Sequence, residues 1–203
     1  MSTIFVNNLS TASGTNITLA SGKQLDATAG TFVPPAGHIV QIVTHRNGDL
    51  PQQNSSSFTE ISSNYRATIT PKYTNSKILI NATVNINPHC ATNTIFLWKL
   101  MRSTAGGSFA DLANVTDGNT GNRLPVSSGG AGRRLNGHDT NDQQPLQWHA
   151  IDTPNTTSAV TYSPYFKQES SGTNTIYFGH SSNNNSNWGN QSYFQATIME
   201  IKV

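Results

Sequence analysis

The sequence predicts an all-β protein: a C-terminal head (residues 36–203) built as a β-sandwich or jelly roll, preceded by an extended N-terminal segment (residues 1–35). Only 11% of the 203 residues are charged, against about 25% in an average soluble domain. Ser, Thr, Asn and Gly, which are poor helix formers, are abundant instead. Several short segments alternate apolar and polar residues, which is typical of half-buried strands. No segment sustains a helical period of 3.6 residues.

The N-terminal segment carries an eight-residue repeat. Its glycines recur at this spacing, and so do single aliphatic residues. One or two aliphatics per eight residues cannot offset the ordering entropy of the backbone, about 1–2 kcal/mol per residue. We therefore expect the segment to be the stem of a homotrimer, with three chains winding about an axis. The expected packing residues are Leu9, Gly14, Ile17, Leu19, Gly22, Leu25, Gly30 and Val33.

Pro34, Pro35 and Gly37 interrupt regular structure and mark the start of the head. The clearest strand of the head is residues 76–86, because Ile78, Ile80, Ala82, Val84 and Ile86 share one face of it. A turn-rich stretch at 116–145 is expected to be a long loop, an excursion or two hairpins. In chain order, the expected strands are 38–43, 65–71, 76–86, 93–102, 109–115, 146–152, 159–169, 174–181 and 192–203.

Residues able to support catalysis or metal binding are scattered along the chain. The sequence contains no GxSxG, P-loop, GxGxxG or HExxH motif. The run at His138, Asp139 and Asp142 fits a solvated turn better than a cation site. His89 and Cys90 are adjacent, so on a strand they would point to opposite faces and could not act as a base and its nucleophile. We expect no enzyme activity, no catalytic residue, no bound metal and no cofactor.

Aromatic residues among turn formers are the candidates for binding. Trp188 lies within "SSNNNSNWGNQSY", and a flat apolar ring surrounded by adaptable polar groups suits a sugar- or protein-binding loop. The alternative is that Trp188 folds back and caps the end of the sandwich. Trp148, next to His149, is a second and weaker candidate. The receptor-contact residues expected are Trp148, Asn185, Asn187, Trp188, Asn190 and Tyr193.

Charge and hydropathy exclude several classes of partner. The net charge is +2 and the only basic pair is Arg133–Arg134, so no nucleic-acid footprint is present. No apolar run approaches the length of about 20 residues that a membrane helix needs, and the N-terminus does not read as a secretion signal. The single cysteine excludes an internal disulfide framework, as expected for a protein made in a reducing cytoplasm.

Four segments together resemble virion fibre and appendage proteins of tailed bacteriophages, particularly phages of aquatic bacteria. They are "SGTNITLASGKQLDATAGTF", "PPAGHIVQIV", "ATITPKYTNSKILINATVNI" and "ATIMEIKV". The segment "FLWKLMRSTAGGSF" also resembles a part of that family where an Arg precedes a Gly-rich turn. The resemblance spans roughly residues 9–115 and 159–203 but not 116–158. It implies a homotrimeric virion protein with a β-sandwich or jelly-roll head, and it transfers no catalytic residue.

The expected function is therefore that of a structural component of the virion, synthesised in the cytoplasm of a bacterial host. The N-terminal segment would attach to other virion proteins, and the head of a tail fibre would contact a glycan or protein of the host surface. One alternative is a capsid decoration or head-fibre protein of the same build, anchored to the capsid by its N-terminus. Another, of a different class, is a free carbohydrate-binding module or lectin.

Overall fold

The computed structural model describes residues 33–89, 94–112, 133–135, 143–168, 174–183 and 189–203, together with Ser21. The chain divides into two units, residues 1–33 and residues 34–203. The second unit is the head. The boundary expected after residue 35 falls two residues inside the head unit.

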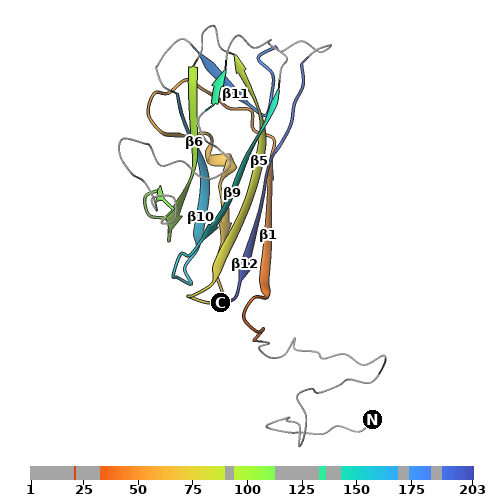
Figure 1. Ribbon diagram of the computed structural model, residues 1–203, viewed down its shortest axis with the longest axis vertical. Helices are drawn as coiled ribbons and strands as arrows, with labels where there is room; N and C mark the ends of the chain where they lie inside the picture. The colour runs from red at the N-terminus through yellow and green to blue at the C-terminus, as the bar shows by residue number, and fades with distance from the viewer. Residues whose placement is uncertain are drawn as a thin grey trace, which may run out of the picture. The chain divides into compact units, whose positions relative to one another are not determined.

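The head consists of two antiparallel sheets (Figure 1). The first sheet has the order β1–β12–β5–β11–β2, and β9 pairs with the opposite edge of β5. Its strands pair entirely antiparallel. Their bounds are β1 Ile39–Asn47, β2 Gln52–Gln53, β5 Lys77–His89, β9 Gln144–Asp152, β11 Thr175–Phe178 and β12 Phe194–Ile201.

The second sheet has the order β3–β10–β6–β7, with β4 pairing with β10 and β8 pairing with β6. A short 3₁₀ turn, η1 (Ser63–Tyr65), precedes β4. The bounds of its strands are β3 Thr59–Glu60, β4 Ala67–Ile69, β6 Thr94–Thr104, β7 Ala110–Asp111, β8 Arg133–Leu135 and β10 Val160–Gln168.

One hydrophobic core joins the two sheets. The alternation expected on β5 is confirmed: Ile78, Ile80, Ala82, Val84 and Ile86 are all buried in this core. The opposite sheet contributes aromatic rings, and Phe166 of β10 meets Phe178 of β11 edge to face, with ring centroids 5.6 Å apart. Trp98 of β6 is also buried there. The all-β sandwich predicted from the sequence is therefore the observed fold of the head.

Each of the nine expected strand segments overlaps an observed strand, and β1, β5, β6 and β9 extend beyond the expected bounds. The sequence did not reveal β2 and β3, because a two-residue strand is too short to show a period of two. The three-residue β8 lies inside the stretch expected to be a loop or hairpins. The remainder of that stretch, up to residue 142, lies outside the described residues.

A tight turn starts the head where the sequence predicted a break. Gly37 has a φ of +85°, a conformation that only glycine adopts at low cost. Its N–H donates to the Lys202 carbonyl at 2.7 Å, and the Lys202 N–H donates to the His38 carbonyl at 3.0 Å. The Lys202 ammonium also donates to the Pro34 carbonyl at 2.8 Å. The entry of the chain into the head is thus fixed beside the end of β12.

Candidate functional site on the outer face of the first sheet

The side of β1, β12, β5 and β9 directed away from the core is called the outer face here. Because side chains alternate along a strand, the register places outward residues in rows across the four strands. Asn81 of β5 lies between Thr197 of β12 and His149 of β9, and in the next row Thr83 lies between Gln195 and Gln147. Both rows therefore consist of amide, hydroxyl and imidazole side chains.

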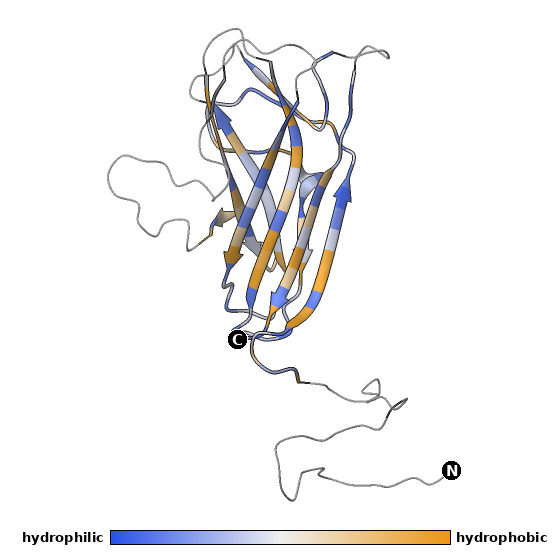
Figure 2. Ribbon diagram, turned by 45° about the vertical axis from the view of Figure 1, so that its right-hand side comes forward, coloured by the Kyte–Doolittle hydropathy of each residue, from blue (hydrophilic) through white to orange (hydrophobic). Residues whose placement is uncertain are grey.

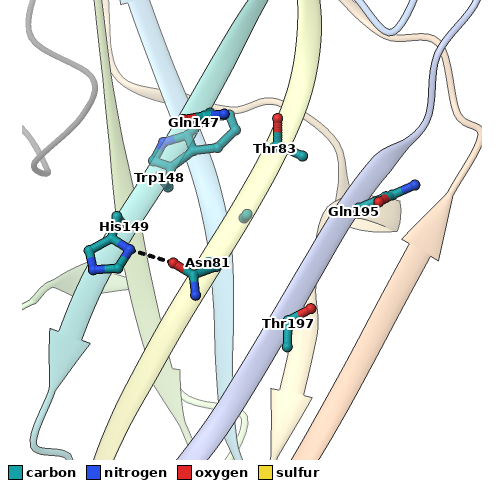
Figure 3. A pocket seen from close by; sticks show the side chains of 8 residues that line it. Asn81, Thr83, Gln147, Trp148, His149, Gln195 and Thr197 are labelled. Carbon is teal, nitrogen blue, oxygen red and sulfur yellow. Dashed lines mark hydrogen bonds between the residues drawn. The ribbon is translucent and has the colours of Figure 1, made fainter.

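These rows form a polar groove, a hollow of about 290 Å³ lined by Asn81, Ala82, Thr83, Gln147, Trp148, His149, Gln195 and Thr197. Figure 3 shows that β9, β5 and β12 supply its lining side by side. His149 Nδ1 and Asn81 Oδ1 are hydrogen-bonded to each other (Figure 3). No carboxylate, Lys or Arg lines the groove, so it suits an uncharged ligand with many hydroxyl or amide groups.

An aromatic platform adjoins the groove. The Arg46 guanidinium lies over the Tyr193 ring, 3.7 Å from its centroid, and Arg46 pairs across the strands with Gln195 of the groove. Tyr193 is about half exposed, and a carbon added to Gly48 would lie 3.2 Å from its ring. A cation stacked on a tyrosine holds the ring in one orientation while leaving its edge accessible.

The structure places Trp148 differently from the sequence-based expectation. Its side chain is 1% exposed and belongs to the hydrophobic core. In β9 it shares a face with Leu146, which is also buried. A buried indole cannot stack on a receptor, so Trp148 supports the floor of the groove and is not a contact residue. His149, its neighbour, does line the groove.

Of the other expected contact residues, Asn190 and Tyr193 are described and both are exposed. The Asn190 carbonyl accepts hydrogen bonds from Gln143 Nε2 at 3.1 Å and from the Ser181 N–H at 3.2 Å. Trp188, Asn185 and Asn187 lie outside the described residues, and so do the expected stem residues apart from Val33, which is exposed. Their roles stay predictions.

A buried ion pair connects the two sheets. Asp152 of β9 is 0% exposed, and the Arg102 Nη1 of β6 donates to both of its carboxylate oxygens, at 2.8 and 2.9 Å. The hydroxyl of Tyr162 in β10 donates to the same carboxylate at 2.8 Å. Burial, followed by the negative charge of Asp152, raises the pKa of Tyr162 well above its usual range. This group is therefore structural.

A second buried carboxylate fixes the loop between β4 and β5. Glu200 of β12 accepts hydrogen bonds from the backbone N–H groups of Lys72 and Tyr73 at 2.8 and 3.1 Å. It also accepts from Ser76 Oγ and from Gln41 Nε2, both at 2.6 Å. Four donors compensate for burying the charge.

The remaining carboxylates of the described residues are likewise held by neighbouring side chains. Their partners are Arg66 and Ser163 for Glu60, Lys99 for Asp111, and Ser62 and Asn64 for Asp49. Within the described ranges, no three His, Cys, Asp or Glu side chains gather in a way that could hold a metal ion. The run at His138, Asp139 and Asp142 lies outside these ranges, as does Cys90. No helix in the part of the chain that the structure describes is long and apolar enough to span a bilayer.

Sequence reasoning missed the polar groove and Arg46. The alternation in β5 did place Asn81 and Thr83 on the face opposite the core. However, their neighbours Thr197 and Gln195 are more than 110 residues away in the chain, so only the register brings them together. A period-two reading of "LQWHAID" would also have put Trp148 on the buried side with Leu146.

Neither protein-family models nor curated proteins gave a match to this chain. Among solved structures, a structure of the Gx strain of infectious bursal disease virus is 7% identical, with a TM-score of 0.41, and the similarity covers 91% of this chain and 46% of that one. The T13 particle of the same virus is 8% identical, with a TM-score of 0.40, covering 91% and 40%. The chain thus spans less than half the length of these structures. Similarity at this level has no bearing on function.

Proposed function

We propose that this chain is a non-enzymatic structural protein of a virus particle: a homotrimeric fibre or appendage of a tailed bacteriophage whose β head contacts the host surface. The proposal rests on how charged and uncharged polar side chains are distributed in the head. Its carboxylates, in the described residues, hold sheets and loops together. Its outer face presents an uncharged groove beside an aromatic platform. Such a surface serves recognition without chemistry.

The sequence supports the viral and trimeric parts of the proposal. The segments "PPAGHIVQIV" and "SKILINATVNI", quoted above for the phage resemblance, correspond to the entry turn with β1 and to most of β5. The eight-residue repeat of residues 1–33 offers too few apolar residues to fold alone. Three heads on one stem would also multiply weak contacts to a host surface into a useful avidity.

Native mass spectrometry of the full chain tests the assembly. A protomer of 21.9 kDa is expected to give one species of three times that mass, stable to dilution. In the full chain, Ile17→Asp is expected to reduce the share of this species, because a charge would replace an aliphatic of the repeat. A chain that is monomeric at every concentration would overturn the trimer.

Imaging of virus particles that carry a labelled version of this protein tests its place in the virion. Density at the tail would support a fibre, and density on the capsid would support the decoration or head-fibre alternative. Particles from which the label is absent, although the protein is made in the infected cell, would refute a virion component altogether.

A free carbohydrate-binding module is the second candidate, and the polar groove favours it. Amide and hydroxyl groups such as those of Asn81, Gln147 and Gln195 can pair with sugar hydroxyls. A glycan array probed with the full chain would identify a ligand. If glycan binding is lost in Gln147→Ala but unchanged in the stem variant Ile17→Asp, the protein is a carbohydrate-binding module and not a fibre. Thr68→Ala, on the other sheet, is the matched control.

A further inference from the structure

Four apolar side chains form a continuous row across the outer face. In register they are Ile42 of β1, Met199 of β12, Leu79 of β5 and Ile151 of β9; this set is called the apolar row. Ile42 and Ile151, at its two ends, are 55% and 45% exposed. Figure 2 shows that β1 changes from mostly hydrophobic (orange) at its start to hydrophilic (blue) at its end. Leu79 and Met199, between them, are partly buried. Isolated exposed aliphatics are normal, whereas contiguous apolar surface is where partners bind.

The surroundings of the row are poor in charge. Ile39 and Ile201 pair with each other next to it and extend the apolar surface towards the end of β12. Among the outward positions of these four strands, the charged side chains are Arg46, at one end, and Lys77, at the other. Depletion of charge around an apolar centre is the composition of a protein–protein interface core. A partner recognised by charge complementarity would not fit here.

The apolar row lies at one end of the outer face, next to the Ile39–Ile201 pair, and the polar groove lies on the next rows of the same face. A contact confined to this end leaves the groove accessible. It is smaller than a standard interface of about 800 Å² per partner, so it would depend on the stem to hold the copies together.

The entry point of the N-terminal segment identifies the occupant. Lys202 binds the chain at Pro34, Gly37 and His38, and it follows Met199 of the row by three residues, roughly 10 Å of strand. Residues 1–33 are therefore attached at the same end of the sheet as the row. Copies joined through these segments would hold their rows at high effective concentration.

We propose that the apolar row packs against the head of a second copy of this chain, with equivalent rows meeting around the three-fold axis. The proposal rests on the homotrimer of the proposed function. It differs from it by assigning an interface to the heads, so that trimerisation does not depend on the N-terminal segments alone.

Thiol labelling of the full chain tests the proposal. In a Cys90→Ser background, Ile42→Cys places one thiol in the row, and Thr68→Cys places one on the exposed side of β4 in the other sheet. Ellman's reagent is added to each variant while native mass spectrometry reports its assembly. In a trimer, the thiol at position 42 is expected to react at least about tenfold more slowly than that at position 68, because an interface closed nine-tenths of the time leaves a tenth of the sites reactive. Ile151→Cys, at the other end of the row, repeats the measurement if the first variant does not fold.

Each other outcome has a defined meaning. Equal rates at positions 42 and 68 in a trimer would overturn the proposed interface and leave the homotrimer intact. Equal rates in a monomer would overturn both. Slow labelling at position 42 in a monomer would show that the chain's own N-terminal segment covers the row, and would overturn the assignment to a second copy.

Discussion

The ion pair between Arg102 and Asp152 predicts an asymmetric response to mutation. In Asp152→Asn, the carboxylate that receives two hydrogen bonds from Arg102 is lost, and the guanidinium is left without its counter-ion. Breaking a buried pair by removing one partner costs about 3–5 kcal/mol. The Arg102 side chain is 21% exposed and can turn towards water, so the free energy of unfolding should fall by about 3 kcal/mol, the low end of that range.

Arg102→Met should cost more than Asp152→Asn. It leaves a carboxylate that is 0% exposed without the guanidinium, while the Tyr162 hydroxyl still donates to it. We expect a loss of about 4–5 kcal/mol. The double variant should lose less than the sum of the two, with a coupling energy of about 0.5–3 kcal/mol.

Urea unfolding of the full chain, followed by far-UV circular dichroism, measures these differences. All variants must be compared at one protomer concentration, because assembly contributes to the stability that is measured. Arg66→Met is the matched control, since its pair with Glu60 is more exposed (side chains 44% and 18%) than the pair of Arg102 and Asp152 (21% and 0%) and should contribute less. Additive single losses, or a loss below about 1 kcal/mol for Asp152→Asn, would refute the inter-sheet role of the pair.

Three further substitutions test separate features. Burial of Glu60 opposes its ionisation, but hydrogen bonds from Arg66 and Ser163 outweigh this and lower its pKa below 4.5. The stability that Glu60 contributes is therefore present above that pH and lost as the pH falls. Glu60→Gln should flatten this acid dependence of the urea midpoint. The raised pKa of Tyr162 keeps the phenol neutral in the folded protein, whereas it ionises near pH 10 in the unfolded chain. Ionisation therefore favours the unfolded state as the pH rises, and Tyr162→Phe should reduce the loss of stability between pH 9 and about pH 11. Gly37→Ala should lower the unfolding free energy by about 1 kcal/mol, because it forces alanine into positive φ; an unchanged urea midpoint would contradict this.

The sequence predicted the strands well because the head is built on alternation. In β5, the five aliphatics from Ile78 to Ile86 are all buried, and Asn81 and Thr83 face outward as the period of two requires. Pairing could not be predicted in the same way. The partner of β1 is β12, at the other end of the chain, and hydropathy carries no information about which strand lies beside which.

The candidate site was harder to predict for the same reason. The polar groove and the Arg46–Tyr193 platform arise from the register of strands far apart in the sequence. Trp148 was expected to contact a receptor because it is aromatic and close to a long loop. It is two residues from Leu146 on β9, so both side chains lie on the same face of the strand, in the core. Asp152 lies on the same face of β9. A charged residue at a core position indicates a buried partner, which is Arg102.

The low charge of the chain and the apolar row belong to one physical problem. The carboxylates of Asp152 and Glu200 are buried within the head, and Arg46 and Lys77 are the charged groups on the outer face of β1, β12, β5 and β9. A face with so little charge does not keep isolated heads apart, and an exposed row containing Ile42 and Ile151 favours their association. Attachment of every head to a shared stem would turn that tendency into one defined contact, because symmetry-related rows would meet before unrelated molecules do. The repeat of residues 1–33 would then bring the copies together, and the apolar row would determine how their heads pack.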